Sequence, residues 1–93
     1  MNKSIDHHET SDTYWREFLR HERFRVIICK DNIQWILQRR KRGAGARWAA
    51  LSYCVTREAL SHVWTAHLGD LAPEIDLLPP TINARRPAEG ETL

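Results

Sequence analysis

Apolar residues follow two periods along the chain, and the first is that of β-strands. Residues 24–29 read FRVIIC, a run rich in β-branched and aromatic side chains, and residues 33–40 alternate between two faces. The turn-forming residues Lys30-Asp31-Asn32 separate the two runs, so the stretch predicts a β-hairpin. After a glycine-containing loop, residues 47–54 predict a third strand.

The second period is helical, and it is strongest after the third predicted strand. A single stripe with spacings i, i+3, i+4, i+7 and i+8 is formed by Leu60, Val63, Trp64, His67 and Leu68. Thr56 is a typical N-cap, and Gly69 stands where a left-handed glycine ends a helix. Residues 13–23 show shorter helical spacing after Asp12, another good N-cap, and predict a short amphipathic helix.

Together these elements predict an α+β fold. We expect a three-stranded antiparallel β-meander packed by one C-terminal helix, with a short N-terminal helix before it. The single domain spans residues 13–78, between a disordered leader (1–12) and a disordered tail (79–93). Pro73 opens one further turn, which places three apolar residues against the body: Leu71, Ile75 and Leu78.

The four tryptophans are expected mainly in the core. Trp64 lies on the apolar stripe of the helix, and Trp15 lies on the apolar side of the short N-terminal helix. Trp35 and Trp48 stand on neighbouring predicted strands and can form a cross-strand pair under the helix. If one of them faces outward instead, it becomes a platform for stacking bases.

The two cysteines are expected to be free thiols. Cys29 and Cys54 end the first and third predicted strands, which are separated by about 9–10 Å across the middle strand. A disulfide needs Cα atoms within about 7 Å. The chain shows no secretory signal and no apolar run long enough to span a membrane, so we expect a cytoplasmic protein.

Charge is distributed unevenly along the chain. Residues 13–69 contain eleven Lys or Arg against four Asp or Glu, a net +7, whereas residues 1–12 and 70–93 carry −2 and −3. A basic body with acidic ends favours a polyanionic partner, although a solvated surface of mixed charge gives the same count.

The basic residues are densest around the loop between the second and third predicted strands. The cations are Arg39, Arg40, Lys41, Arg42 and Arg47. Long cationic side chains suit phosphates, and Gly43 and Gly45 allow a close backbone approach. Gln34 and Gln38 on the middle strand complete the predicted nucleic-acid-binding set. Two alternatives remain for the loop: it binds an acidic protein partner, or it is only a solvated surface. The GAGA run lacks the Lys-Ser or Lys-Thr step of a phosphate-binding loop.

No pattern points to catalysis, a cofactor or a metal. The sequence shows no nucleophile with a nearby base and no paired acids in an apolar setting. His62 and His67 are five residues apart, and neither matches a zinc spacing with the cysteines. We therefore expect a binding protein rather than an enzyme.

The stretch from the first strand to the long helix resembles, in layout, two families of DNA-binding domains. The middle strand would be residues 34–39 (QWILQR), and residues 47–51 (RWAAL) with 56–59 (TREA) would form the third strand and the start of the helix. The families are the ethylene-response-factor type and the arm-site domain of tyrosine integrases. The resemblance implies three antiparallel strands that lie in the major groove. The chain also looks like short uncharacterised proteins of bacterial phages and integrative elements.

These observations predict a small accessory or regulatory protein that binds nucleic acid, most simply DNA, through a basic hairpin loop and a sheet face. The alternative is a protein-interaction module or inhibitor that docks on a regulatory or host protein. The acidic, leucine-rich residues 70–78 favour that alternative. A homodimer is compatible with either function.

Overall fold

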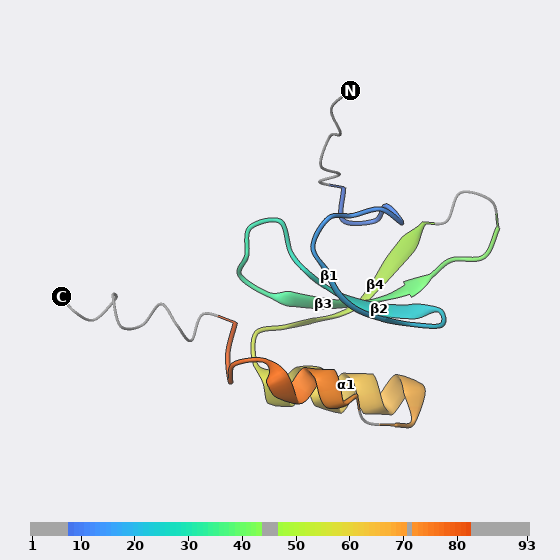
Figure 1. The fold of residues 1–93 in the computed structure, drawn as a ribbon. Coiled ribbons are helices and arrows are strands. Elements are labelled where there is room, and N and C mark those ends of the chain that lie inside the picture. Colours follow the sequence, from blue (N-terminus) through green and yellow to red (C-terminus); the bar gives the residue numbers. More distant parts are fainter. Residues whose placement is uncertain (1–7, 44–46, 71, 83–93) are drawn as a thin grey trace.

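Four antiparallel strands form one sheet, and a single helix lies across it (Figure 1). The computed structural model describes residues 8–43, 47–70 and 72–82. The elements in chain order are β1 (Glu17–His21), β2 (Phe24–Ile28), β3 (Trp35–Arg40), β4 (Trp48–Cys54), the helix α1 (Arg57–Leu68) and the short 3-10 helix η1 (Pro73–Leu77). The sheet order follows the chain, β1-β2-β3-β4. The α+β class is confirmed, and the sheet has one strand more than the predicted meander.

The predicted hairpin, third strand and long helix are all present. β2 pairs with β3 and β3 pairs with β4, both antiparallel. Asn32, in the turn between β2 and β3, takes a left-handed conformation with φ 60°. The Thr56 hydroxyl accepts a bond from the Ala59 backbone N–H at 3.0 Å, as an N-cap does. Gly69 ends α1 with φ 85° and donates to the Thr65 carbonyl at 2.8 Å. Both ends of α1 are therefore where the sequence predicted them.

The predicted N-terminal helix over residues 13–23 is wrong. Residues 17–21 instead form β1, which pairs with β2 and carries a register shift between Glu17 and Leu19. Such a bulge lets Phe18 and Leu19 both pack against the same core, although they are neighbours in sequence. Phe18 and Leu19 stand four positions after Tyr14 and Trp15, so the sequence alone shows the i, i+4 spacing that is typical of a helix.

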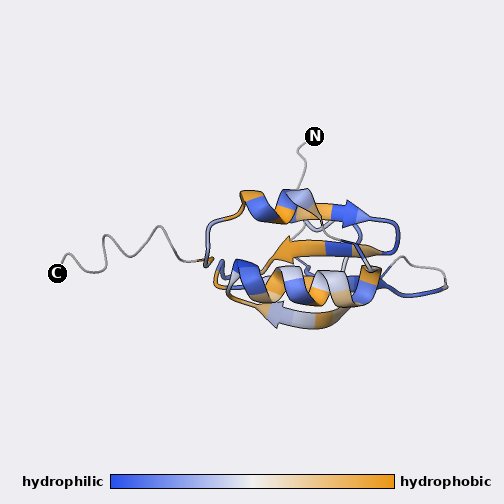
Figure 2. Cartoon of the chain, turned by 90° about the horizontal axis from the view of Figure 1, so that it is seen from below, coloured by the Kyte–Doolittle hydropathy of each residue, from blue (hydrophilic) through white to orange (hydrophobic). Residues whose placement is uncertain are grey.

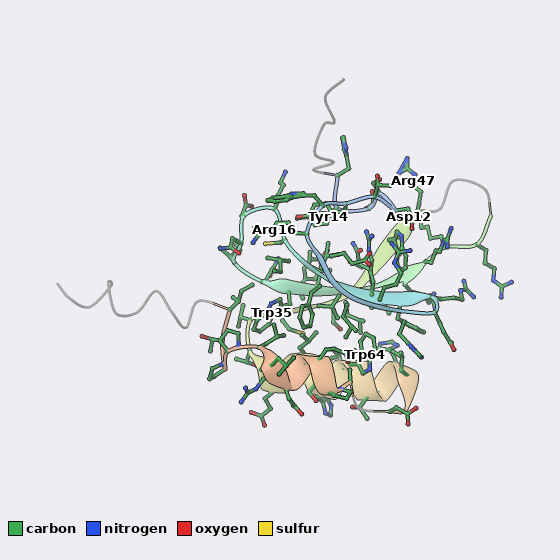
Figure 3. The ribbon with its side chains drawn as sticks, viewed as in Figure 1. Asp12, Tyr14, Arg16, Trp35, Arg47 and Trp64 are labelled. Carbon is green, nitrogen blue, oxygen red and sulfur yellow. The ribbon has the colours of Figure 1, made fainter. Side chains whose placement is uncertain are left out.

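One face of the sheet, here the helix face, packs against α1. The core on this face includes Val26, Trp35 and Leu37 from the strands, and Leu60 and Trp64 from α1. Figure 2 shows apolar colouring on the strands behind α1, and Figure 3 shows Trp35 between sheet and helix. The turn that Pro73 was expected to open is η1, whose Ile75 is buried in the same core. Leu71 lies outside the described residues.

The opposite face, here the segment face, is covered by residues 8–16, the N-terminal segment (Figure 1). The Tyr14 ring is buried with Ile27, Cys29 and Ile36, and its hydroxyl donates to the Ile28 carbonyl at 2.8 Å. Residues 8–12 were expected to belong to a disordered leader, but they lie on the sheet and bond to it. As a result, β3 is buried on both faces from Trp35 to Gln38.

The tryptophans and cysteines are divided between the two faces. Trp35 is on the helix face and Trp48 is on the segment face, so the expected cross-strand pair is wrong, although both rings are buried. Trp15 is 48% exposed rather than in the core. Cys29 and Cys54 are both buried and free, and they belong to core clusters on opposite sides of the sheet.

Candidate nucleic-acid interface

Five cations gather at the end of the sheet where the β1–β2 and β3–β4 connections lie. A hollow of about 390 Å³ is lined by Ala49 and by the residues here called the basic tip: Arg23, Arg39, Arg40, Lys41 and Arg42. All five are exposed. Four of them were predicted from the sequence. Arg23 was missed because residues 13–23 were read as a helix, whereas it lies in the tight β1–β2 turn.

One backbone bond and one side-chain bond join the β1–β2 turn to the end of β3 at the basic tip. The Arg40 N–H donates to the Arg23 carbonyl at 2.7 Å, and an Arg23 guanidinium nitrogen donates to the Arg40 carbonyl at 2.9 Å. Gly43 has φ 101°, a conformation that lets the chain turn directly after Arg42. Arg23, Arg39, Arg40 and Lys41 are therefore carried by hydrogen-bonded backbone rather than by a free loop, which reduces the entropy lost when they bind a ligand.

The basic tip is not neutralised within the described part of the chain. No ion pair there involves any of its five residues, and the nearest acid in sequence, Glu22, approaches His21 at 3.8 Å instead. Like charges held this close repel one another, and they leave a positive potential at one end of the molecule. An anion with several negative groups would relieve that repulsion.

The other predicted interface residues do not line the hollow of the basic tip. Arg47 is exposed and lines a second hollow beside His8 and Asp12, although its carbonyl accepts from the Lys41 N–H at 2.8 Å (Figure 3). Gln34 lies before β3, at the opposite end of the sheet. Gln38 is buried, and its side-chain amide donates to the Glu9 carbonyl at 2.9 Å. Neither glutamine belongs to the surface that the basic tip presents.

Gln38 belongs instead to a network around Arg25, which is 0% exposed. The Arg25 guanidinium donates to Gln38 Oε1 at 2.7 Å, to Glu17 Oε1 at 3.2 Å, and to the carbonyls of Glu9 and Ser11 at 3.0 and 2.8 Å. It also lies 4.4 Å from the centre of the Trp48 ring. This buried cation fastens the N-terminal segment to the sheet, so its role is structural.

The carboxylates of this network are held in their charged form. The bond from the Trp48 indole N–H, with the nearby Arg20 guanidinium, lowers the pKa of Asp12 below its ordinary value. Burial by itself would raise the pKa of Glu17, but its bonds with Arg20 and Arg25 outweigh burial and lower it. Both acids are thus bonded to internal partners, and of the basic tip only Arg40 lies close enough to Asp12 to contribute to the lowering of its pKa.

The opposite end of the sheet carries apolar side chains. A cleft of about 510 Å³ is lined by Arg16, Ile28, Asn32, Trp35, Leu77, Leu78, Pro79 and Ile82. Leu77 is 81% exposed, and Ile33 and Trp15 are about half exposed. The molecule therefore has one cationic end and one apolar end.

The described residues offer no metal site or membrane span. None of their His, Cys, Asp and Glu side chains form a group of three that could hold a metal ion. No helix among them is long and apolar enough to cross a membrane. The buried Arg25 is paired with Glu17 at 3.2 Å.

Comparison with protein-family models, with curated proteins and with solved structures gives no significant match to this chain.

Proposed function

We propose that this protein binds nucleic acid, with DNA as the expected ligand, through phosphate contacts made by the basic tip. The observation that carries the proposal is the hollow lined by five exposed cations with no ion-pair partner in the described part of the chain. Arginine binds phosphate through paired N–H donors, and contacts of this kind dominate affinity for nucleic acid. Such a protein would act as an accessory or regulatory factor on its ligand.

The covered sheet supports a contact through the tip rather than through a sheet face. α1 covers one face, and on the other face the N-terminal segment covers β2 and β3. Domains that read bases from a sheet need an exposed strand face with long polar side chains. Here Gln38, which would have served that purpose, is bonded to Arg25 and Glu9. We therefore expect strong dependence on salt and weak dependence on base sequence.

The test is an anisotropy titration of the full chain against labelled duplex and single-stranded DNA at low salt. We expect micromolar or tighter binding that is lost as salt is raised, and competition by unlabelled DNA of unrelated sequence. Single-stranded RNA of the same length shows whether the sugar matters. Absence of binding to every nucleic acid at micromolar protein would exclude the proposal.

A second candidate function is docking on another protein, and the apolar end favours it. Leu77 is almost fully exposed beside a cleft whose walls include Ile28, Leu78 and Ile82. Exposed apolar side chains that rim a cleft mark interaction sites more often than isolated ones do. Arg16 is the one ionised residue among those lining the cleft, and it would suit an apolar partner side chain flanked by a carboxylate.

Native mass spectrometry of the purified protein, followed by affinity capture, tests this second candidate. A specific protein partner should be retained by the wild-type chain and lost with Leu77→Glu, which places a charge at the cleft. Equal retention by both forms would remove the apolar end from consideration. Recovery of nucleic acid alone would favour the basic tip.

A further inference from the structure

The two outer strands of the sheet differ in how they meet solvent. β1 is short, is interrupted by a bulge, and carries three titratable side chains: Glu17, Arg20 and His21. Charges and bulges on an outer strand prevent it from pairing with another chain. β4 is longer, and no residue from Trp48 to Thr56 is charged. The edge formed by β4 therefore lacks the protection that β1 has.

The two ends of β4 are already engaged by the chain itself. The Trp48 N–H donates to the Thr10 carbonyl at 3.0 Å, and the Val55 carbonyl, just past β4, accepts from the Ile82 N–H at 3.0 Å. Among the described residues, no other backbone group bonds to the outer side of this strand. Residues 49–54 between these two contacts form an open edge with backbone donors and acceptors facing solvent.

Apolar side chains accompany this open edge. Tyr53 is 61% exposed and Val55 is 52% exposed. Tyr53 lies on β4 and Val55 follows directly after the strand, so the two form an apolar strip at its end. Tyr53 is paired with Ile36, a residue of the segment-face core, which places the Tyr53 ring on that side of the sheet. The open backbone of residues 49–54 and the exposed Tyr53 ring thus coincide.

We propose that the outer edge of β4 pairs with β4 of a second copy of this chain, antiparallel about a twofold axis. An antiparallel edge is complementary to itself, because each outward N–H meets a carbonyl under twofold rotation. The charge distribution favours this partner. Residues 48–56 carry no charge, so two copies can meet along them without bringing like charges opposite one another, as they would at the basic tips.

The antiparallel arrangement also separates the two cationic ends. β4 begins beside the basic tip and ends beside the apolar end, so twofold pairing places the two tips at opposite ends of the joined sheet. Leu51 has no partner in β3, because Leu37 pairs with Ser52 and Gln38 pairs with Ala50. This bulge shortens the regular part of the contact. A short edge contact buries little area, so we expect a weak dimer that dissociates on dilution.

Sedimentation velocity of the nucleic-acid-free full chain, over a wide range of protein concentration, tests the proposal. The wild-type chain should shift from monomer to dimer as concentration rises. Tyr53→Lys should weaken this association about tenfold or more, because it places a charge in the apolar strip of each copy. Ala66→Lys is the matched control, since it adds the same charge at an exposed position of α1, away from β4 and from the apolar cleft. It should leave the association unchanged.

Any other pattern overturns the proposal. A wild-type chain that stays monomeric at every concentration leaves the edge for an extended peptide of another protein or for another segment of this chain. A dimer that resists Tyr53→Lys, or that is equally weakened by Ala66→Lys, uses a different surface. Because no nucleic acid is present in this experiment, a chain that does not dimerise would disprove the β4 contact without bearing on nucleic-acid binding by the basic tip. Circular dichroism of each variant shows that the fold is retained.

Discussion

Replacing Arg25 with methionine tests the structural account most severely, because this one side chain joins β2 to three other parts of the molecule: β1, β3 and the N-terminal segment. It lies on β2, bonds to Gln38 on β3 and Glu17 on β1, and bonds to the carbonyls of Glu9 and Ser11. Methionine fills a similar volume but donates nothing. The substitution therefore removes the bonds while largely preserving the packing.

The cost follows from what is left behind. Replacing a buried ion pair as a whole can be neutral, but removing one partner costs about 3–5 kcal/mol, because the other groups stay buried and unpaired. Here Glu17 keeps its bond with Arg20 at 2.8 Å, and the N-terminal segment can reach water by lifting from the sheet. We therefore expect a loss near the lower end, about 3 kcal/mol. For a domain of this size that lowers Tm by about 12–24 °C.

Thermal unfolding followed by circular dichroism measures the loss, and hydrogen exchange locates it. The Trp48 N–H, which donates to the Thr10 carbonyl, should exchange faster in Arg25→Met than in the wild type, whereas amides in α1 should change only with global stability. Arg25→Lys keeps the charge but loses the forked donors, so it should fall between the two. A Tm within about 2 °C of wild type for Arg25→Met would refute the reasoning.

Three further predictions concern the core and the titratable groups. Trp64→Ala should cost about 3–5 kcal/mol, since it empties the centre of the seam between α1 and the sheet, and chemical denaturation measures it. The lowered pKa values of Asp12 and Glu17 stabilise the fold above the unfolded pKa of about 4, and this stability is lost as pH falls through their lower folded pKa values. Glu17→Gln should therefore make the free energy of unfolding depend less on pH in the acid range. An unchanged dependence of unfolding free energy on pH would contradict the network. Burial raises the pKa of Cys54, and both Cys29 and Cys54 are buried, so a thiol reagent should react with the native chain far more slowly than with the unfolded chain, and rapid labelling would contradict the packing.

The parts of the fold that sequence predicted well are those with an unambiguous period or cap. α1 has a full apolar stripe between a threonine cap and a left-handed glycine, and these local signals agree with the packing. β2 is apolar except for Arg25 and is rich in β-branched residues, which favours a strand, and β3 and β4 are preceded by clear turn or loop signals. In these stretches local preference and tertiary structure point the same way.

The parts that sequence missed depend on contacts between distant segments. The bulge in β1 puts neighbouring residues on one face and so reproduces a helical spacing. Residues 8–12 are polar and carry no apolar period, yet Arg25 and Gln38 bind their carbonyls from the sheet. A buried arginine that binds backbone carbonyls leaves no signature in the sequence, because any residue can supply the carbonyl.

Only part of the candidate site was predicted, again because the rest depends on contacts between distant segments. Consecutive cations at positions 39–42 are visible in any reading of the sequence, and the structure brings them together with Arg23 from a separate turn. That juxtaposition depends on β1 being a strand, which the sequence did not indicate. Gln38 was selected for its position on an alternating strand, and its face is occupied by the N-terminal segment.

The salt dependence of DNA binding, measured on two variants of equal net charge, tests the central claim most directly. Arg39→Ala/Arg42→Ala removes two cations from the basic tip, and Arg16→Ala/Lys30→Ala removes two exposed or partly exposed cations from the opposite end of the sheet. If the tip holds phosphate, the first variant should bind more weakly and flatten the slope of log affinity against log salt by about two units, at about 0.9 per lost phosphate contact, while the second keeps nearly the wild-type slope. Equal slopes for both variants would show that only net charge matters, and the basic tip would not be the binding site.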